Sequence, residues 1–303
     1  MKHVAIIDMG TNTFHLMLAT ITSEGFMINH REKAAVKIGM GGINEGYITD
    51  DGIERAVKAM KEFKTTIQDA RIENALALGT SALRNARNGE EVVKRIEAES
   101  GIKTHIISGI QEAEYIYKGA KASMNIGSEK SLIMDIGGGS VEFIIGNNQK
   151  IFWSHSFEIG GQRLLEKFQK HDPILKEEVT DLFLFFEKEL VILLTELKIH
   201  NPKTLIGSSG TFDTLSDIYC WKNNLPLNDT PETPFNMDAF DNIYEEFLLK
   251  DRAARMQIPG MIELRVDMIV VACCLIEFIL SKHAFDRIRV TSYSLKEGVL
   301  ASL

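Results

Sequence analysis

The chain of 303 residues is 45% hydrophobic and 25% charged, a balance typical of a globular protein with room for two domains. Its formal net charge of −8 argues against a broad basic surface for nucleic acid, so a polyanionic ligand would need local positive charge. The cysteines, Cys220, Cys273 and Cys274, form neither a disulfide framework nor a C-x-x-C pair typical of zinc sites. The apolar run 268–280 is too short to span a bilayer, so no membrane partner is expected.

The first half of the chain alternates strand and helix patterns from its start, so no signal peptide is expected and the expected location is the cytoplasm. Apolar residues recur every three or four positions from Ile53 to Ile67, which predicts a helix that Thr49, Asp50 or Asp51 can cap. A polar stretch of small residues at 125–130 marks the expected end of a first domain, 1–125. The strands expected here are 3–7, 14–21, 26–32, 35–38, 75–78 and 104–107, and the further helices are 90–100 and 111–122.

The second half repeats this alternation and is expected to form a second domain, 126–293. Segment 225–236 holds three of the six prolines and is predicted to be a surface loop. The strands expected here are 131–134, 143–146, 151–157, 204–206 and 287–291, and the helices are 161–169, 175–197, 238–249, 266–281 and a last one from residue 294.

The most informative stretch is DIGGGSVE, from Asp135 to Glu142, which lies between two apolar strands. Its three glycines and serine predict a tight turn whose backbone N–H groups can surround an anion. Asp135 enters the turn and Glu142 leaves it, and carboxylates beside a phosphate commonly hold Mg²⁺. The alternative is a hairpin without a ligand, because short glycine motifs also occur by chance.

A second copy of this stretch lies near the N-terminus. DMGTNTFHLML, from Asp8, matches it in the aspartate, the glycine and the hydroxyl residue, with apolar residues following in both. A further pair, GTSA from Gly79 and GSSG from Gly207, recurs at nearly the same spacing, and each member follows an apolar strand. Two small-residue loops in the same order predict an internal duplication, with two similar α/β halves that offer their loops to a shared cleft.

These motifs resemble the exopolyphosphatase and guanosine pentaphosphate phosphohydrolase (Ppx/GppA) family, in a short form without additional C-terminal helical domains. The resemblance implies an α/β fold of two duplicated actin-like (ribonuclease H-like) domains with an interdomain cleft. It also implies that the C-terminal helix, 294–303, packs against the first domain. The segments that carry it span essentially the whole chain: DMGTNTFHL from Asp8, GTSALRNAR from Gly79, ISGIQEAEYIY from Ile107, DIGGGSVE from Asp135, GSSGT from Gly207 and SLKEG from Ser294.

Glu112 is the candidate catalytic base. It lies in the first turn of a predicted helix, just after the break at Gly109, and the resemblance implies that this glutamate activates the attacking water. Considered without the family, Glu112 is explained as well by the favourable position of an acid at a helix N-terminus. The chain departs from the family pattern at Gln111, where another glutamate is common, and at Glu114, where a basic residue is usual. Both departures leave the pKa of Glu112 open.

The candidate phosphate-binding residues lie at the four small-residue loops and at two arginines. Arg84 follows Gly79 by five residues, and its guanidinium suits a bidentate phosphate contact, although a surface arginine is the alternative. Arg265 resembles a family arginine that contacts polyphosphate, although its neighbours would also suit an ion pair. The full set is Asn12, Thr13, Arg84, Gly138, Gly139, Ser140, Gly210, Thr211 and Arg265.

Asp8, Asp135 and Glu142 are the candidate Mg²⁺ ligands, because all three flank the predicted anion-binding turns. The alternative for the two aspartates is that they brace glycine turns. The dipeptide His171-Asp172 resembles a metal-binding pair but has no matching partners in the sequence, so it is predicted to be structural. His15 is expected to be an ordinary hairpin side chain.

The sequence therefore predicts a phosphohydrolase that releases the terminal phosphate of inorganic polyphosphate by Mg²⁺-assisted attack of water. Hydrolysis of guanosine pentaphosphate to the tetraphosphate is the alternative. Glu112 argues against a nucleotide-dependent kinase or chaperone-like binder of the same superfamily. The retained base and metal acids argue against a non-catalytic sensor of polyphosphate or the alarmone. The sequence does not decide which polyphosphate chain length is preferred or whether the protein forms a homodimer.

Overall fold

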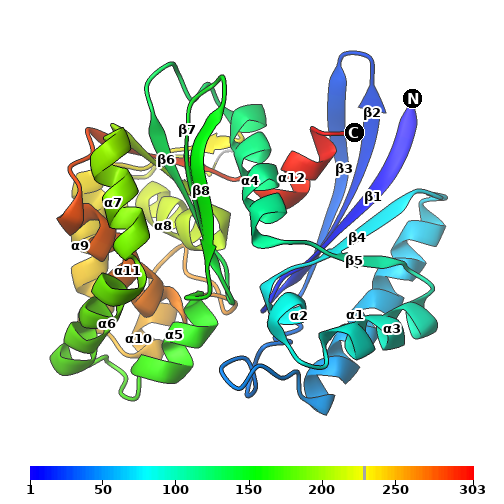
Figure 1. Cartoon of the computed structure of the whole chain (residues 1–303), viewed down its shortest axis with the longest axis horizontal. Coiled ribbons are helices and arrows are strands. Elements are labelled where there is room, and N and C mark those ends of the chain that lie inside the picture. The colour runs from blue at the N-terminus through cyan, green and yellow to red at the C-terminus, as the bar shows by residue number, and fades with distance from the viewer. Residues whose placement is uncertain (228–229) are drawn as a thin grey trace.

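The structure is a computed structural model that describes residues 1–227 and 230–303. Its strands form two mixed sheets, one in each of two lobes (Figure 1). The first sheet has the order β3-β2-β1-β4-β5, with β1 Lys2–Met9, β2 Phe14–Thr22, β3 Gly25–Ala34, β4 Ala75–Gly79 and β5 Thr104–Ile106. The second has the order β10-β11-β9-β6-β7-β8, with β6 Ser131–Ile136, β7 Val141–Gly146, β8 Ile151–Phe157, β9 Thr204–Ser208, β10 Glu232–Thr233 and β11 Arg287–Thr291.

The two sheets share one topology. The central strand β1 pairs antiparallel with β2 and parallel with β4, and β6 pairs in the same way with β7 and β9. The next strands also agree, because β3 and β8 continue antiparallel while β5 and β11 continue parallel. Strand β10 is an addition at one edge of the second sheet. The predicted duplicated α/β fold of the actin-like (ribonuclease H-like) kind is thereby confirmed.

Helices pack on both faces of each sheet. In the first lobe α1 and α3 cover the outer face, and in the second lobe α6, α8, α9 and α11 do so. Helices α4 and α12 lie between the two sheets, as Figure 1 shows. The bounds are α1 Asp50–Asp69, α2 Ser81–Asn85, α3 Gly89–Ser100, α4 Gly109–Ser123, α5 Gly161–Phe168, α6 Lys176–Glu189, α7 Val191–His200, α8 Ser209–Lys222, α9 Met237–Leu249, α10 Arg252–Met256, α11 Ile269–Lys282 and α12 Leu295–Leu300.

Strand alternation decides which side chains reach the space between the sheets. The neighbours of Asp8 in β1 pack against the outer helices, so Asp8 itself faces the interior of the molecule. The neighbours of Asp135 in β6 and of Glu142 in β7 also pack outward, so these two acids face inward as well. The alternating direction of side chains along three separate strands thus brings three carboxylates to the same space.

The C-terminal helix α12 packs tightly against α4 and β1. A Cβ added at Gly298 would lie 1.7 Å from the carbonyl oxygen of Tyr115, and one added at Gly119 would lie 2.3 Å from that of Ser294. Only residues without a side chain permit this approach of two helix backbones. The two glycines therefore allow the backbone of the last helix to pack directly on that of α4 in the first lobe.

Several elements differ from the sequence prediction. Residues 35–38 do not extend the sheet, because Lys37 adopts a left-handed backbone with φ 47° that ends the extended chain. The helix predicted over 175–197 is two helices, because the buried Leu190 leaves the helical conformation between them. Segment 225–236 contains the short strand β10, and its residues 228–229 lie outside the described part of the chain.

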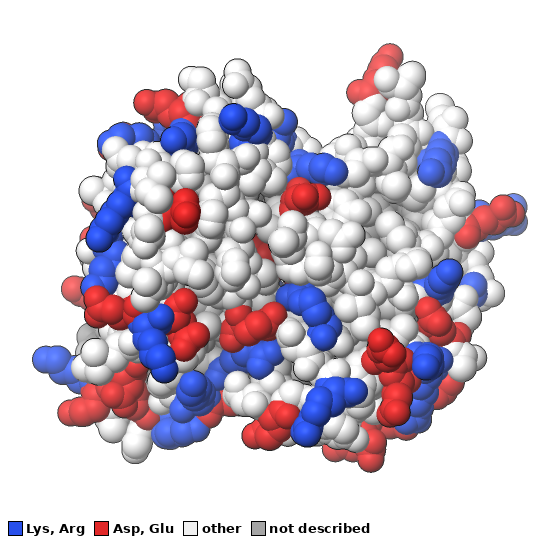
Figure 2. Space-filling model, viewed as in Figure 1, with Lys and Arg blue, Asp and Glu red and all other residues white. Residues whose placement is uncertain are grey.

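The charged side chains on the face shown in Figure 2 are of both signs and are interspersed, without one broad basic area. This distribution agrees with the net charge of −8. Within residues 1–227 and 230–303, none of the helices has the length and apolar character needed to cross a membrane.

Candidate active site

Two hairpin turns with the same internal hydrogen bond face the space between the sheets. In the β1–β2 turn the N–H of Gly10 donates to the carbonyl oxygen of Thr13 at 3.2 Å. In the β6–β7 turn the N–H of Gly137 donates to the carbonyl oxygen of Ser140 at 3.0 Å. The two turns noticed as similar in the sequence therefore also have matching backbone geometry.

Glycines bring the second turn into direct contact with the first lobe. A Cβ added at Gly138 would lie 2.9 Å from Nδ2 of Asn12, and one added at Gly139 would lie 2.5 Å from Oγ of Ser81. A larger residue at either position would displace Asn12 or Ser81 of the first lobe. The five predicted residues of the two turns line one cavity of about 80 Å³, which we call the inner cavity: Asn12, Thr13, Gly138, Gly139 and Ser140.

Four carboxylates share the inner cavity with these turns. They belong to Asp8, Glu112, Asp135 and Glu142, and the cation on the cavity wall is Arg265. Burial raises the pKa of Asp8 and of Glu112 to about 7. Burial also raises the pKa of Asp135, and it raises the pKa of Glu142 well above its ordinary value. A cluster of acids in so small a space favours protons or cations as partners.

Glu112 projects from the first turn of α4, as predicted, and is 7% exposed. The helix begins with a capping box, in which the side chain of Gln111 accepts from the N–H of Ser108 at 3.0 Å. This gives Gln111 a structural role at the helix start. Glu114, on the same helix, is exposed. The largest effect on the pKa of Glu112 is burial, which raises it. The guanidinium of Arg84 opposes this effect and lowers the pKa.

Arg84 lies beside Glu112 rather than on a cavity wall. It extends from α2, and its Nη1 donates to Oε2 of Glu112 at 2.7 Å and to the carbonyl oxygen of Ile107 at 3.2 Å. Its Nη2 donates to Glu158 at 3.2 Å. Arg84 is absent from the linings of both the inner cavity and its larger neighbour described below. Glu158 was not singled out from the sequence, because nothing in its local pattern distinguishes it.

The carboxylates of the inner cavity have the chemistry that Mg²⁺ requires. Ser208 donates to Asp135 at 2.9 Å and Ser156 donates to Glu142 at 2.6 Å, so both carboxylates are fixed in place. Among the described residues, no group of three or more His, Cys, Asp or Glu side chains is arranged to hold a metal ion. Mg²⁺ commonly binds through one or two carboxylates together with water and substrate phosphates. The carboxylates therefore fit Mg²⁺ as a partner of a bound phosphate.

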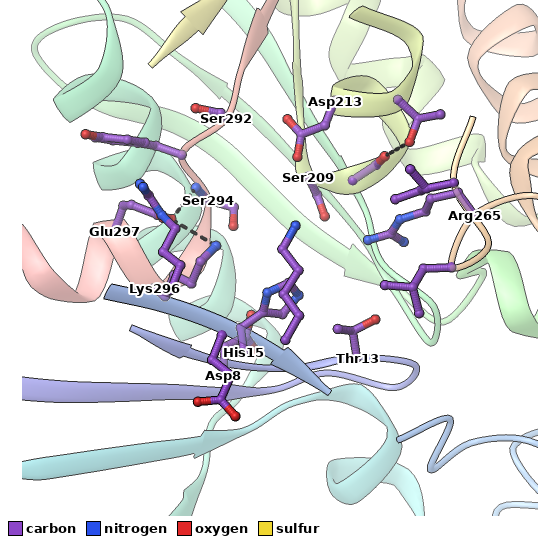
Figure 3. A pocket seen from close by; sticks show the side chains of 18 of the residues that line it. Asp8, Thr13, His15, Ser209, Asp213, Arg265, Ser292, Ser294, Lys296 and Glu297 are labelled. Carbon is purple, nitrogen blue, oxygen red and sulfur yellow. Dashed lines mark hydrogen bonds and ion pairs between the residues drawn. The ribbon is translucent and has the colours of Figure 1, made fainter. Parts of the chain in front are cut away.

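A larger cavity of about 290 Å³, which we call the outer cavity, adjoins the inner one (Figure 3). Strands β1, β2 and β3, the start of α8 and the start of α12 surround it. Lys33, Asp213 and Lys296 line it and were missed in the sequence. Lys296 stands within the SLKEG motif, which is a usable signal, whereas Lys33 and Asp213 stand in no motif. The residues common to both cavities are Asp8, Thr13, His15, Ser209, Arg265 and Ser294.

Arg265 lies at the junction of the two cavities, against the backbone of Gly210. A Cβ added at Gly210 would lie 2.0 Å from Nη2 of Arg265. The ion pair considered from the sequence does not form, because Asp267 accepts from Arg252 at 2.7 Å instead. Arg265 makes no ion pair with any residue that the structure describes, so its charge is available to a ligand.

Two further titratable groups line the outer cavity. Burial raises the pKa of Asp213 to about 6, against the opposing charges of Lys296, Arg265 and Lys33. Burial lowers the pKa of His15 well below its ordinary value, and the same cations lower it further. His15 is therefore a neutral imidazole on the walls of both cavities, a closer position to the site than its sequence suggested.

The remaining candidates lie away from the two cavities. Thr211 is buried within α8 and lines neither cavity. His171 contacts Glu178 at 3.0 Å, and Asp172 accepts from the buried Arg255 at 2.6 Å. These contacts give the His171-Asp172 dipeptide the structural role predicted for it.

Comparison with known proteins gives consistent matches. A model of the Ppx/GppA phosphatase family matches residues 17–303. The crystal structure of an exopolyphosphatase from Cytophaga hutchinsonii is 40% identical, with a TM-score of 0.96 over 99% of this chain and 97% of that one. A Ppx/GppA family member from Aquifex aeolicus is 28% identical, with a TM-score of 0.80 over 99% and 97%. A guanosine-5'-triphosphate,3'-diphosphate pyrophosphatase from Pseudoalteromonas translucida is 26% identical over 300 residues, which are 99% of this chain but 59% of that protein.

The duplicated fold and the acid-lined cavity between two glycine turns are those of an actin-like protein, and the matches make it a phosphoanhydride hydrolase. More specifically, the chain belongs to the Ppx/GppA phosphatase family. The family resemblance inferred from the sequence motifs is thereby confirmed.

Proposed function

We propose that this protein releases the terminal phosphate of inorganic polyphosphate by direct attack of water, with Mg²⁺ as cofactor. The observation that carries the proposal is the position of Glu112, whose carboxylate lines the inner cavity together with both glycine turns. Backbone N–H groups of such turns can hold a terminal phosphate. A carboxylate beside that phosphate can take a proton from the attacking water.

Glu112 has one carboxylate oxygen available for this role. Its Oε2 accepts from Arg84, whereas none of the described residues donates to Oε1. Oε1 is therefore the atom that would accept the proton of the attacking water. The pKa of about 7 makes this carboxylate a stronger base than an ordinary glutamate.

Mg²⁺ would be held by Asp8, Asp135 and Glu142 together with phosphate oxygens. When bound, the metal ion would neutralise charge on the transferred phosphate. Arg265 would add a fixed positive charge on the cavity wall. Without such cations, the four carboxylates of the inner cavity would repel a polyanion.

The outer cavity would hold the rest of the substrate. Arg265 leads into it, and Lys33 and Lys296 lie on its walls, which suits the phosphates that follow the terminal one. A second candidate substrate is guanosine pentaphosphate, for which one group of the outer cavity offers a contact. Oδ1 of Asp213 is buried and accepts no hydrogen bond from the described residues, so it could accept from a guanine base.

One assay separates these substrates. Phosphate release is measured side by side from long polyphosphate, tripolyphosphate, guanosine pentaphosphate and ATP, with Mg²⁺ and after chelation. The proposal expects the highest kcat/KM on polyphosphate, the lowest on ATP, and no turnover without the metal. A preference for guanosine pentaphosphate would support the second candidate. Binding without turnover of any compound would instead indicate a sensor, and equal efficiency on ATP would favour a kinase-like protein.

A further inference from the structure

Glu158 joins the two lobes at the edge of the inner cavity. It follows β8 in the second lobe, and its Oε2 accepts from Oγ of Ser81 in the first lobe at 2.6 Å. Its Oε1 accepts from Nη2 of Arg84, also in the first lobe, at 3.2 Å. Arg163 of the second lobe donates to Oε2 at 3.2 Å. One carboxylate thus binds three partners from both sides of the molecule.

These contacts continue in both directions until they reach the candidate active site. On one side, the other guanidinium nitrogen of Arg84 donates to Glu112 at 2.7 Å. On the other side, Nε of Arg163 donates to the carbonyl oxygen of Gly139 at 2.8 Å. Glu158 is therefore the central member of a chain of hydrogen bonds that links the glycine turn of the second lobe to the candidate base of the first.

We propose that Glu158 is a positioning residue, which holds the Arg84 guanidinium so that only one oxygen of Glu112 is occupied. This inference rests on the proposed function of Glu112 as the base. Because Glu158 lies in the second lobe and Arg84 in the first, the base reaches its working orientation only when the lobes are together. The glycine turn and the base are thereby aligned by the same contact.

The planar guanidinium of Arg84 explains why the carboxylate of Glu158 matters for the orientation of Glu112. Arg84 presents a fixed set of N–H donors, which readily forms two parallel bonds with one carboxylate. With Glu158 in place, Nη2 is directed to Glu158 and Nη1 to Glu112. Without Glu158, both nitrogens can turn to Glu112 and occupy the oxygen that the attacking water needs. The expected defect is therefore in turnover rather than in substrate binding.

A second interlobe carboxylate provides a matched control. Glu166, on α5, accepts from the N–H of Gly41 at 3.2 Å and from Nδ2 of Asn44 at 3.3 Å in the first lobe. Glu166 therefore also bonds across the lobes, but neither Arg84 nor Glu112 is among its partners in the described chain. Substituting it tests the loss of an interlobe contact without disturbing the base.

The test compares Glu158→Gln with Glu166→Gln in the full chain, using steady-state kinetics on the best substrate of the panel. The amide introduced by Glu158→Gln can still accept from Ser81, but it lacks the charge that holds Arg84. We expect kcat of Glu158→Gln to fall by about 10- to 100-fold with KM changed less than about threefold, as for a misplaced catalytic group. Glu166→Gln should keep kcat within about twofold of the parent, and Glu158→Asp should recover part of the loss.

A double-variant cycle completes the test. The lysine of Arg84→Lys cannot donate to Glu112 and Glu158 from one planar group. Combining this substitution with Glu158→Gln should therefore cause little further loss of kcat. Full additivity of the two losses, or equal losses in Glu158→Gln and Glu166→Gln, would overturn the inference. Thermal unfolding of each variant checks that the fold is intact. If Glu112→Gln keeps its activity, the proposed base is wrong, and that result is separate from the Glu158 comparison.

Discussion

Nη1 of Arg84 lies 2.7 Å from Oε2 of Glu112, and both side chains are largely withdrawn from solvent. The guanidinium expected to bind phosphate therefore contacts the candidate base, while Arg265 lies on the walls of both cavities. Replacing Arg84 and replacing Arg265 should therefore affect different kinetic parameters.

Arg84→Ala should lower kcat, whereas Arg265→Ala should mainly raise KM. The reason is that Arg84 orients Glu112, and Arg265 offers a charge without a partner among the described residues. A charge-assisted contact to phosphate is worth about 1.5–3 kcal/mol, or roughly a 10- to 150-fold change in binding. Steady-state kinetics at two salt concentrations measures both effects. An Arg84→Ala defect confined to KM would return Arg84 to the substrate contact predicted from the sequence.

Glu112→Gln should abolish most turnover while leaving substrate binding intact. The amide keeps the shape of the side chain but cannot accept the proton, which typically costs about 10²–10⁴ in rate. The matched control is Glu114→Gln, an exposed carboxylate in the same helix. Single-turnover phosphate release and equilibrium binding provide the two measurements. A loss smaller than about tenfold would show that Glu112 is not the base.

Replacing the inward-facing acids of the second lobe should raise the Mg²⁺ requirement. Asp135→Asn and Glu142→Gln each exchange a charged oxygen ligand for a neutral one. A Mg²⁺ titration of activity measures the shift, with Asp241→Asn as an exposed control on α9. Identical titrations for all the variants would remove both acids from the metal site.

The metal-free protein should lose stability as the pH rises. Burial raises the pKa of Asp8 from 3.8 to about 7, so between those values the folded protein keeps a proton that the unfolded chain has released. This contribution to the free energy of unfolding is complete below about pH 4 and declines as the pH approaches about 7. Asp8→Asn cannot ionise, so it should raise Tm in EDTA at about pH 8 but not at about pH 4. The same Tm difference at both pH values would contradict the assignment.

A single methyl group at Gly210 should disturb the junction of the two cavities. The added Cβ would overlap Arg265, with Nη2 only 2.0 Å away. Gly210→Ala should therefore raise KM in the same direction as Arg265→Ala, with Gly101→Ala as a control at a site where the added Cβ meets no atom within 4 Å. Because φ at Gly101 is +67°, the control variant is compared only for KM, after its Tm is recorded. An unchanged KM in Gly210→Ala would indicate that Arg265 can move aside without losing its ligand.

The sequence predicts the fold well because most of its elements carry a local signal. The repeated turns identify the duplication and the acids beside them, whereas β6 and β7 are buried on both faces, so the direction in which their acids point follows only from the packing. The Leu190 break was not predictable, because apolar residues lie on all sides of α7 and no glycine or proline marks the break. Lys37 was missed because its left-handed backbone is set by the surrounding loop and not by its residue type.

The site was predictable only where its residues belong to motifs. Asp8, Asp135 and Glu112 stand in short segments with recognisable neighbours, and the structure places them on one cavity. Glu158 contacts residues of the first lobe that are distant in sequence, and Lys33 reaches the outer cavity from a strand without a motif, so no local pattern predicts either position. The contact between Arg84 and Glu112 is of the same kind, because it depends on how α2 meets α4 in space.

The packing of α12 against α4 also has a consequence for biosynthesis. The strands of the first sheet are all translated by residue 106, but the groove beside Gly119 stays uncovered until Gly298 has left the ribosome. Lys296, which lines the outer cavity, is delivered by the same late segment. The nascent chain therefore carries an uncovered face of α4 from the time that this helix is made until helix α12 follows, and the complete site assembles only after translation of helix α12.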